Sequence, residues 1–375
     1  MRPWGTIRKP LRPPELPIYP GCRTKRNSMP AVQEALHRAA ARQDLSEQQS
    51  SAALQEILDG RSSPPLIAAL LVALRMKGET ADEVTGFARA MRASATGVRT
   101  VRTPPELLVD TCGTGGDGGS TFNVSTAAAL VAAGAGVPIA KHGNRAVSSK
   151  CGSADVLEAL GVNVKLVADQ AARCIDEVGI GFLFAQAMHP AMRHAGPVRR
   201  ELGMRTVFNM LGPLTNPAGA AVQVMGVYDD QIVPLAAAAL ARLGARRALV
   251  VHGSDGMDEI TTTGPTRFSE VVRGKVSRQG SLEPDEFDVA QASAASLSGG
   301  DTDRNASIVR SVLAGERGPA RDIVVVNAAA AIHMSEAATS WRASAALAQE
   351  AIDSGAAAEK LAKLAELSSR LAGTG

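Results

Sequence analysis

Residues 107–153 read LLVDTCGTGGDGGSTFNVSTAAALVAAGAGVPIAKHGNRAVSSKCGS, and this stretch decides the fold class. An apolar run stops at Asp110 and is followed by five glycines within seven residues. Asn123, Ser125 and Thr126 then open an alanine-rich segment, and a second apolar run ends before a basic one. This order predicts a strand, a glycine turn, a capped helix, a second strand and a basic loop over Lys141–Arg145. It brings two loops to one edge of a sheet.

The glycine-rich turn has the features of an anion site. Glycine lacks Cβ, reaches positive φ and lets backbone N–H groups approach a ligand closely. Successive N–H groups followed by a helix N-terminus form an anion cradle. The polar residues that open the helix are of the types that cap such ends, and Lys141 and Arg145 add two positive charges on the next loop. We therefore predict a phosphate-rich ligand.

The same turn matches G-x-G-x-x-G from Gly113 to Gly118, a pattern that by itself suggests a dinucleotide site. Such a site needs an acidic residue at the end of the next strand to bind a ribose hydroxyl. Lys141 stands there instead, and a cation suits a phosphate better than a ribose diol. We therefore expect a phosphate cradle rather than a dinucleotide turn or a merely flexible loop.

Composition describes an ordinary globular chain. The 375 residues are 45% hydrophobic and 21% charged, which allows one large or two modest domains. The four cysteines show no C-x-x-C spacing, which argues against a zinc site and a disulfide framework and suits a reducing cytoplasm. No apolar run reaches the roughly 20 residues of a membrane span.

Charge is unevenly distributed. Residues 1–28 hold seven basic residues and one acidic residue, a net +6, so the rest of the chain carries +3 − 6 = −3. A nucleic-acid partner inferred from the overall charge would therefore be an error. The leader lacks the apolar core of a secretory signal. It is either a disordered arm or a start-site extension upstream of Met29, and we favour the extension.

Two patterns follow the leader. Residues 29–97 show helical periodicity throughout and predict an all-α domain of about four helices, with a likely contribution from residues 190–210. From residue 98 to 375, short apolar runs alternate with alanine-rich helices, which predicts an α/β domain with a mostly parallel central sheet and flanking helices. The expected strands are Leu107–Val109, Val137–Ala140, Gly181–Ala185, Gln223–Val227, Ala248–Val251 and Ile323–Val326.

Two further groups of residues have the types that a phosphate-binding enzyme needs. Asp258 and Glu259 closely follow an expected strand, and Mg²⁺ binds through one or two carboxylates plus substrate phosphates. A polar turn is the alternative, but a phosphate cradle on the same sheet edge favours the metal. Four arginines lie in residues 190–217 and suit a carboxylate ligand; the sequence alone does not choose among Arg193, Arg199, Arg200 and Arg205.

Taken together, the motifs resemble a known family. They are DTCGTGGD at residues 110–117, NVST at 123–126, KHGNR at 141–145, CGSADVLE at 151–158, VRRELG at 198–203, FNMLGPLTNP at 208–217 and DE at 258–259. In this order, and over roughly residues 30–345, the chain resembles the anthranilate phosphoribosyltransferases.

The resemblance implies transfer of the phosphoribosyl group of 5-phosphoribosyl 1-pyrophosphate to anthranilate in tryptophan biosynthesis, by a Mg²⁺-dependent cytoplasmic homodimer. It assigns the phosphoribosyl donor to Gly113, Gly116, Asp117, Thr121, Asn123, Ser125, Thr126, Lys141, Ser149 and Ser153. It assigns anthranilate to Gly113, Asn144 and Arg199, and Mg²⁺ to Ser125, Asp258 and Glu259. Met192 departs from the pattern, because relatives can carry an aromatic residue there.

The expected chemistry needs no general acid or base. Displacing pyrophosphate from a sugar carbon develops negative charge on the leaving group, which N–H donors, the Lys141 ammonium and Mg²⁺ stabilise electrostatically. The aromatic amine is uncharged at neutral pH and attacks without prior deprotonation. We expect the amides near Gly116, Lys141 and a cation held by Asp258 and Glu259 to converge on one diphosphate.

Two rival functions are considered. A pyrimidine nucleoside phosphorylase shares the two-domain plan but would use free phosphate and would not need the carboxylates of Asp258 and Glu259. A family member that has lost catalysis and binds nucleic acid should lack part of the pyrophosphate site and carry a basic face. This chain keeps the site residues, and residues 29–375 have a net negative charge, so the nucleic-acid rival ranks low. The phosphorylase is the nearest rival enzyme, and the presence of Asp258 and Glu259 favours the transferase over it.

Overall fold

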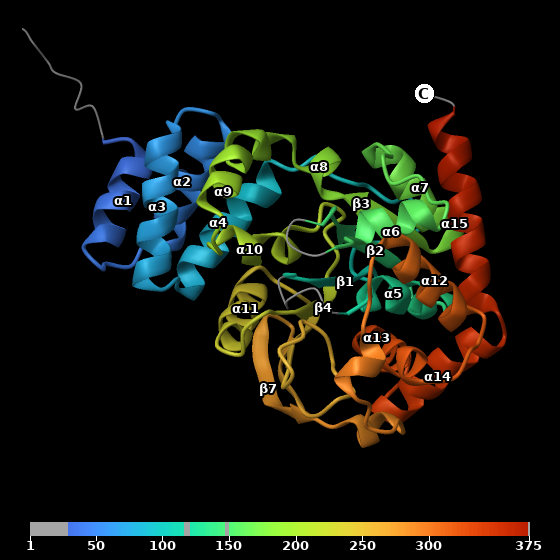
Figure 1. Cartoon of the computed structure of the whole chain (residues 1–375). Coiled ribbons are helices and arrows are strands. Elements are labelled where there is room, and N and C mark those ends of the chain that lie inside the picture. Colours follow the sequence, from blue (N-terminus) through green and yellow to red (C-terminus); the bar gives the residue numbers. More distant parts are fainter. Residues whose placement is uncertain (1–28, 116–120, 147–149, 374–375) are drawn as a thin grey trace, which may run out of the picture. The chain divides into compact units, whose positions relative to one another are not determined.

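Four helices begin the part of the chain that the computed structural model describes, which is residues 29–115, 121–146 and 150–373 (Figure 1). They are α1 (Ala31–Ala40), α2 (Glu47–Leu58), α3 (Pro64–Lys77) and α4 (Ala81–Ala93). Capping boxes at Ser46 and Thr80 start α2 and α4, because each side chain accepts an otherwise unpaired N–H of the first turn. Val32, Leu54 and Leu70 are among the side chains that these helices bury together.

A later segment packs on the same helices. It comprises α8 (Ala185–Met188), η1 (Pro190–His194), α9 (Gly196–Leu202), α10 (Phe208–Leu211) and η2 (Pro213–Thr215). Val198 and Phe208 belong to the apolar cluster of α1–α4, and α9 contacts α3. Arg92 of α4 donates to the carbonyl of Leu214 at 2.7 Å. The segment therefore connects the helical region to the sheet.

The sheet has seven strands in the order β3-β2-β1-β4-β5-β6-β7. They are β1 (Val109–Gly113), β2 (Ile139–Gly143), β3 (Ile180–Phe184), β4 (Val222–Gly226), β5 (Arg247–Gly253), β6 (Thr266–Val272) and β7 (Lys275–Leu282). The first five pair in parallel, and β6 and β7 are antiparallel. The prediction of a small helical region followed by an α/β fold with a mostly parallel sheet is confirmed.

Two buried apolar clusters lie on opposite faces of the sheet. On β5, Leu249 and Val251 belong to one cluster and Ala248 and Val250 to the other, as the alternation of a strand requires. The second cluster includes α1–α4 and α11 (Ile232–Arg242). Helices of the first cluster are α5 (Val124–Gly134), α6 (Ser153–Ala159), α7 (Ala168–Val178), α12 (Thr302–Leu313), α13 (Pro319–Met334), α14 (Trp341–Asp353) and α15 (Ala356–Ala372).

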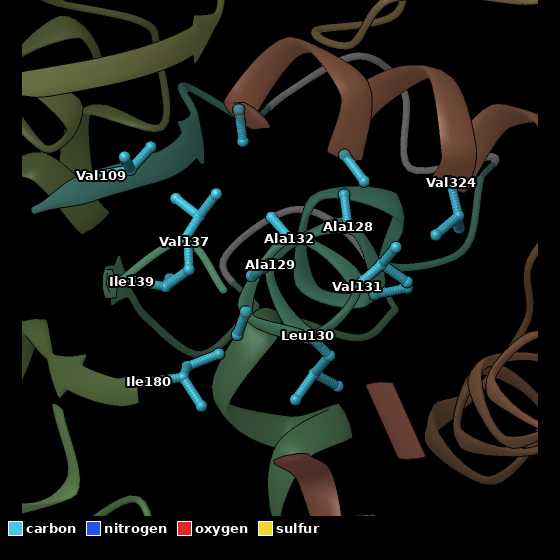
Figure 2. Close-up of a cluster of buried hydrophobic side chains, with 14 of the residues drawn as sticks. Val109, Ala128, Ala129, Leu130, Val131, Ala132, Val137, Ile139, Ile180 and Val324 are labelled. Atoms are coloured by element: carbon cyan, nitrogen blue, oxygen red, sulfur yellow. The ribbon is translucent and has the colours of Figure 1, made fainter. Parts of the chain in front are cut away.

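Helix α5 lies at the centre of the first cluster, which explains its alanine-rich sequence. It contacts α13, α14 and α15 as well as the strands, and Ala127 to Ala133 are all buried. A Cβ added at Gly134 would lie 2.8 Å from the backbone nitrogen of Ala357, so the helices approach closely there. Figure 2 shows Ala128, Ala129 and Ala132 among the larger side chains of this cluster. Small residues are therefore a packing requirement.

Several expectations about individual elements are wrong. Ile323–Val326 is not a strand but lies inside α13, because a fully buried helix is apolar on all sides and cannot be told from a buried strand by pattern. Lys141, His142 and Gly143 belong to β2 and not to a loop. The first strand begins at Val109 and continues through Asp110, and the β6–β7 hairpin was not expected.

The structure also addresses the membrane expectation. Among the helices in the described ranges, none is long and apolar enough to cross a bilayer.

Candidate active site

Four neighbouring parallel strands end in glycine at one edge of the sheet. Gly113, Gly143, Gly226 and Gly253 are the last residues of β1, β2, β4 and β5. Helix α5 begins at this edge, shortly after β1 in sequence. The crevice outside the carboxyl ends of the strands is where α/β sheets bind ligands.

Gly113 and Gly226 together make room for Asp258. They lie opposite each other in the β1–β4 register, and we call this pair the glycine notch. A Cβ at Gly113 would lie 2.2 Å from the Asp258 Oδ2, and a Cβ at Gly226 would lie 1.5 Å from the Asp258 backbone oxygen. Gly113 therefore has a reason to be glycine that does not involve a ligand. Sequence analysis missed Gly226, although a glycine that ends an apolar strand was a usable signal.

The two carboxylates expected to hold a metal both reach the glycine turn and the start of α5. Asp258 is 9% exposed, and its Oδ2 accepts the N–H of Gly115 at 2.7 Å. Oε1 of Glu259 accepts the N–H of Ser125 at 3.0 Å. Ser125 lies in the first turn of α5, where N–H groups lack helical partners and the helix dipole attracts negative charge. The carboxylates therefore lie at the predicted anion cradle.

A tight polar turn shapes the loop that carries these carboxylates. The side chain of Asp255 accepts the hydroxyls of Thr261 and Thr263, each at 2.6 Å, and the N–H of Met257 at 3.1 Å. Gly256 has a φ of 91°, a region that disfavours other residues. These contacts close the loop after β5 and direct Asp258 and Glu259 back toward the sheet edge.

Lys141 lies on β2 and is only 2% exposed. Its Nζ donates to the carbonyl of Thr111 at 2.5 Å and to the hydroxyl of Ser125 at 3.3 Å. Burial lowers the pKa of Lys141, while the nearby carboxylates, those of Asp258 and Glu259 among them, act in the opposite direction. The structure therefore joins Lys141, Ser125 and Glu259 in one hydrogen-bonded set at the N-terminus of α5.

Asn123, Thr126 and Thr121, which were expected to bind the phosphoribosyl donor, differ in the contacts that they make. Asn123 forms no side-chain cap of α5; its amide instead donates to the carbonyl of Cys151 and accepts from Asn305, both at 3.1 Å. The expected capping role of Asn123 is therefore wrong. The hydroxyl of Thr126 is buried and has no hydrogen-bond partner among the described residues. Thr121 forms an isolated bridge with Ser298.

The loop after β2 is closed on itself. The hydroxyl of Ser153, at the start of α6, accepts the N–H of Asn144 and donates to its carbonyl, each at 3.2 Å. Arg145 was expected to offer a charge to phosphate, but its guanidinium pairs with Asp155 at 2.8 Å and Glu158 at 2.6 Å. Arg145 is therefore paired with two acidic residues of α6. Gly116, Asp117 and Ser149 lie outside the described residues.

The structure distinguishes among the four arginines. Arg199 of α9 lies over the ring of Phe208 at 5.1 Å, and burial lowers its pKa. It forms no ion pair with any acidic residue of the described ranges. Arg205 instead stacks on Tyr228 at 4.0 Å, and Arg193 donates to His194. A half-buried guanidinium without an acidic partner is suited to an anionic ligand.

Two buried histidines lie close together, one of them near the end of β2. His142 and His189 have ring centroids 5.2 Å apart, and Nδ1 of His142 is 3.0 Å from the carbonyl of Gly212. Burial, and for His142 the neighbouring His189, lowers the pKa of His142 to about 3, and burial lowers that of His189 to about 4. Both rings are therefore neutral at physiological pH.

The donor set fits a hard cation that also binds phosphate. Asp258 and Glu259 supply carboxylate oxygens, and Ser125 supplies a hydroxyl beside Glu259. The described residues contain no group of three or more His, Cys, Asp or Glu side chains that could hold a metal ion. Mg²⁺ fits this arrangement, because it takes one or two carboxylates and completes its coordination with water and phosphate oxygens.

Comparisons with known proteins show the family of the chain. Residues 106–358 match the family model described as glycosyl transferase family, a/b domain, and residues 33–95 match its helical bundle domain. Anthranilate phosphoribosyltransferase of Rubrobacter xylanophilus is 54% identical over 92% of this chain and 99% of its own length. That of Solibacter usitatus is 56% identical over 88% of this chain and 97% of its own.

Solved structures give the same result. Anthranilate phosphoribosyltransferase of Thermus thermophilus has a TM-score of 0.84 and 45% identity, covering 90% of this chain and 99% of its own. That of Saccharomyces cerevisiae in complex with PRPP and Mg has a TM-score of 0.82 and 28% identity, covering 92% of this chain and 99% of its own. Sequence and fold agree, and the chain belongs to the anthranilate phosphoribosyltransferase family of glycosyltransferases.

Proposed function

We propose that the chain transfers the phosphoribosyl group of 5-phosphoribosyl 1-pyrophosphate (PRPP) to the amine of anthranilate, with release of pyrophosphate, as a step of tryptophan biosynthesis. The observation that carries this proposal is the meeting of Lys141, Ser125 and Glu259 at the N-terminus of α5, with Asp258 in the adjacent glycine notch. Cationic, hydroxyl and carboxylate groups at one helix N-terminus suit a diphosphate with a divalent cation.

The donor half of the site stabilises the leaving group. The positive end of the α5 dipole and the ammonium of Lys141 supply positive charge where the departing diphosphate gains negative charge. Because Lys141 is buried and hydrogen-bonded, its charge is already oriented before the reaction. We assign donor binding to the residues of the glycine turn and its neighbours: Gly113, Gly116, Asp117, Thr121, Asn123, Ser125, Thr126, Lys141, Ser149 and Ser153.

The proposed cofactor is Mg²⁺, held by Ser125, Asp258 and Glu259. When bound, it would neutralise pyrophosphate charge as a Lewis acid. A relative from Saccharomyces cerevisiae was solved in complex with PRPP and Mg. The protein itself positions the two carboxylates. The glycine notch makes room for Asp258, and the hydrogen bonds of Asp255 close the loop that carries both residues.

The acceptor half of the site binds an aromatic carboxylate. We assign the carboxylate of anthranilate to Arg199, whose guanidinium stacks on Phe208, and the rest of the ring to Gly113 and Asn144. Another structure of the Saccharomyces cerevisiae relative is in complex with 4-fluoroanthranilate. The amine nucleophile is neutral at physiological pH, so positioning beside the donor supplies most of the catalysis.

We also propose the wider organisation expected from the sequence. It comprises a helical domain over residues 29–97 with a contribution from 190–210, a donor-binding α/β domain over 98–375, a homodimer, and a cytoplasmic location. The two family matches, at residues 33–95 and 106–358, support this division. Light scattering of the full chain tests the dimer, and a monomer at micromolar concentration would contradict it.

The function is tested with the purified full-length protein. We expect pyrophosphate release and loss of anthranilate fluorescence when PRPP, anthranilate and Mg²⁺ are supplied together, and neither when Mg²⁺ is chelated. Metal-independent phosphorolysis of a pyrimidine nucleoside, without pyrophosphate release from PRPP, would overturn the proposal in favour of the phosphorylase. Retention of nucleic acid with no turnover of either substrate pair would favour the non-catalytic rival.

A further inference from the structure

One buried amide holds the loop of Asp258 and Glu259 from behind. Asn327 lies in α13 and is 3% exposed. Its Oδ1 accepts the N–H of Ile260 at 2.9 Å, and its Nδ2 donates to the carbonyl of Ile260 at 2.9 Å. Ile260 directly follows Glu259. A single side chain therefore binds both backbone polar groups of the residue next to the proposed metal ligands.

We call this pair of hydrogen bonds to Ile260 the Asn327 clamp. Nδ2 of Asn327 also donates to the carbonyl of Ile323, one turn earlier in α13, at 2.9 Å. With one accepted and two donated hydrogen bonds, both polar groups of the amide are engaged. In surroundings as apolar as these, another orientation would leave a buried polar group unpaired, which is costly. Asn327 therefore holds Ile260 in one position relative to α13.

The loop that carries Asp258 and Glu259 has little room to move, because both residues make close contacts with neighbouring elements. Asp258 lies against the glycine notch, and Glu259 reaches the N–H of Ser125 in α5. Helix α13 also packs on α5. Asn327 thus connects the loop to α13, which packs on α5. The positions of the two carboxylates are therefore fixed relative to the N-terminus of α5.

We propose that Asn327 is a positioning residue for the transfer reaction, setting where the carboxylates of Asp258 and Glu259 lie relative to the N-terminus of α5. The inference rests on the proposed function, in which those carboxylates hold the cation of the leaving diphosphate. Residues that orient metal ligands without touching the metal change metal affinity or activity by about 10- to 100-fold when they are removed. Asn327 belongs to that class.

Two substitutions and one control test the proposal. Asn327→Leu keeps a side chain of similar size and removes all three hydrogen bonds, whereas Asn327→Ser shortens the side chain so that it no longer spans both groups of Ile260. Val324→Ala removes apolar packing from the same helix, in the cluster around α5 (Figure 2). The control therefore matches the general destabilisation of α13 but leaves the clamp intact.

The readout is Mn²⁺ binding, followed by electron paramagnetic resonance of the full-length protein in the presence of pyrophosphate. We expect both Asn327 variants to bind Mn²⁺ about 10- to 100-fold more weakly. Their KM for PRPP should rise while the KM for anthranilate stays within about twofold, and the Ile260 amide should exchange its hydrogen faster. Val324→Ala should bind Mn²⁺ as the wild type does, even where its melting temperature falls equally.

Wild-type Mn²⁺ affinity in a folded Asn327 variant would overturn the positioning role. If Asn327→Leu does not fold, Asn327→Ser decides, since it adds no apolar bulk. An equal loss of Mn²⁺ binding in Val324→Ala would also overturn the role, because general destabilisation of α13 would then explain the effect. A wild type that releases no pyrophosphate refutes the proposed function, whichever way the titrations come out; the positioning role is judged by the titrations alone.

Discussion

Replacing Gly226 by alanine tests whether the glycine notch places the carboxylate loop. The added Cβ would lie 1.5 Å from the backbone oxygen of Asp258 and 2.4 Å from its carbonyl carbon. Ordinary contacts begin at 3.4 Å, so the oxygen would have to retreat by about 1.9 Å, the difference between 3.4 and 1.5 Å. A backbone group cannot rotate away as the end of a long side chain can. The whole Asp258–Glu259 segment must therefore shift.

The size of this shift sets the expected effect. A misplacement of about 1 Å can cost about 100-fold in rate, which corresponds to about 2.7 kcal/mol of transition-state stabilisation. We therefore expect kcat/KM for PRPP to fall at least about 100-fold in Gly226→Ala. Overpacking should also lower the free energy of unfolding by about 1–3 kcal/mol, which leaves room for a folded variant.

Pyrophosphate release at saturating anthranilate measures the effect, with circular dichroism to establish that the variant is folded. Gly97→Ala is the matched control, because it makes the same chemical change at an exposed glycine where the added Cβ meets no atom of the described residues within 4 Å. We expect that control to keep wild-type kcat/KM. A folded Gly226→Ala protein with wild-type kcat/KM would refute the role of the notch.

Three further outcomes are expected. Arg199→Ala should raise the KM for anthranilate at least about tenfold, the worth of a charge-assisted hydrogen bond, and leave the KM for PRPP nearly unchanged; an unaltered anthranilate KM would count against the assignment. Asp258→Asn combined with Glu259→Gln should raise the Mg²⁺ concentration for half-maximal rate at least about tenfold, and normal Mg²⁺ dependence would contradict the metal role. Burial holds the pKa of His142 at about 3 and that of His189 at about 4, so unfolding releases rings that take up protons below about pH 6.5. The contribution of the two neutral rings to the free energy of unfolding is complete above that pH. It is lost as the pH falls toward 4 and 3, and the free energy of unfolding then drops by up to about 1.4 kcal/mol per pH unit for each ring. Urea unfolding at several pH values should therefore show a shallower acid loss in His189→Gln, and an unchanged slope would refute this account.

The class of fold could be predicted from local patterns. Helical periodicity in the first region and strand–helix alternation afterwards are short-range properties, and both agree with the structure. The run Ile323–Val326 shows where this stops, because α13 is buried on all sides and carries no polar face. The β6–β7 hairpin was missed for the opposite reason. Almost all of β7 is exposed, so it lacks the apolar run by which strands were sought.

The types of residue at the site could be predicted from the sequence, but the contacts that hold those residues in place could not. The glycine turn, Lys141, and Asp258 with Glu259 were each suggested by charge and by position after a strand. Asn327 is a single polar residue within an apolar run, which indicates a buried amide. The sequence does not show which group that amide binds. Arg145 looked like a phosphate ligand until the structure paired it with α6.

The sequence by itself determined the α/β class of the fold and predicted an anion cradle, two carboxylates beside it and an arginine for a carboxylate ligand, because these inferences depend on residue type and local spacing. Only the tertiary structure decided which glycines face Asp258, which of the four arginines is partly buried, and which amide holds the loop. These facts depend on contacts between residues far apart in the chain. Such contacts are set by the packing of whole elements, which no local pattern contains.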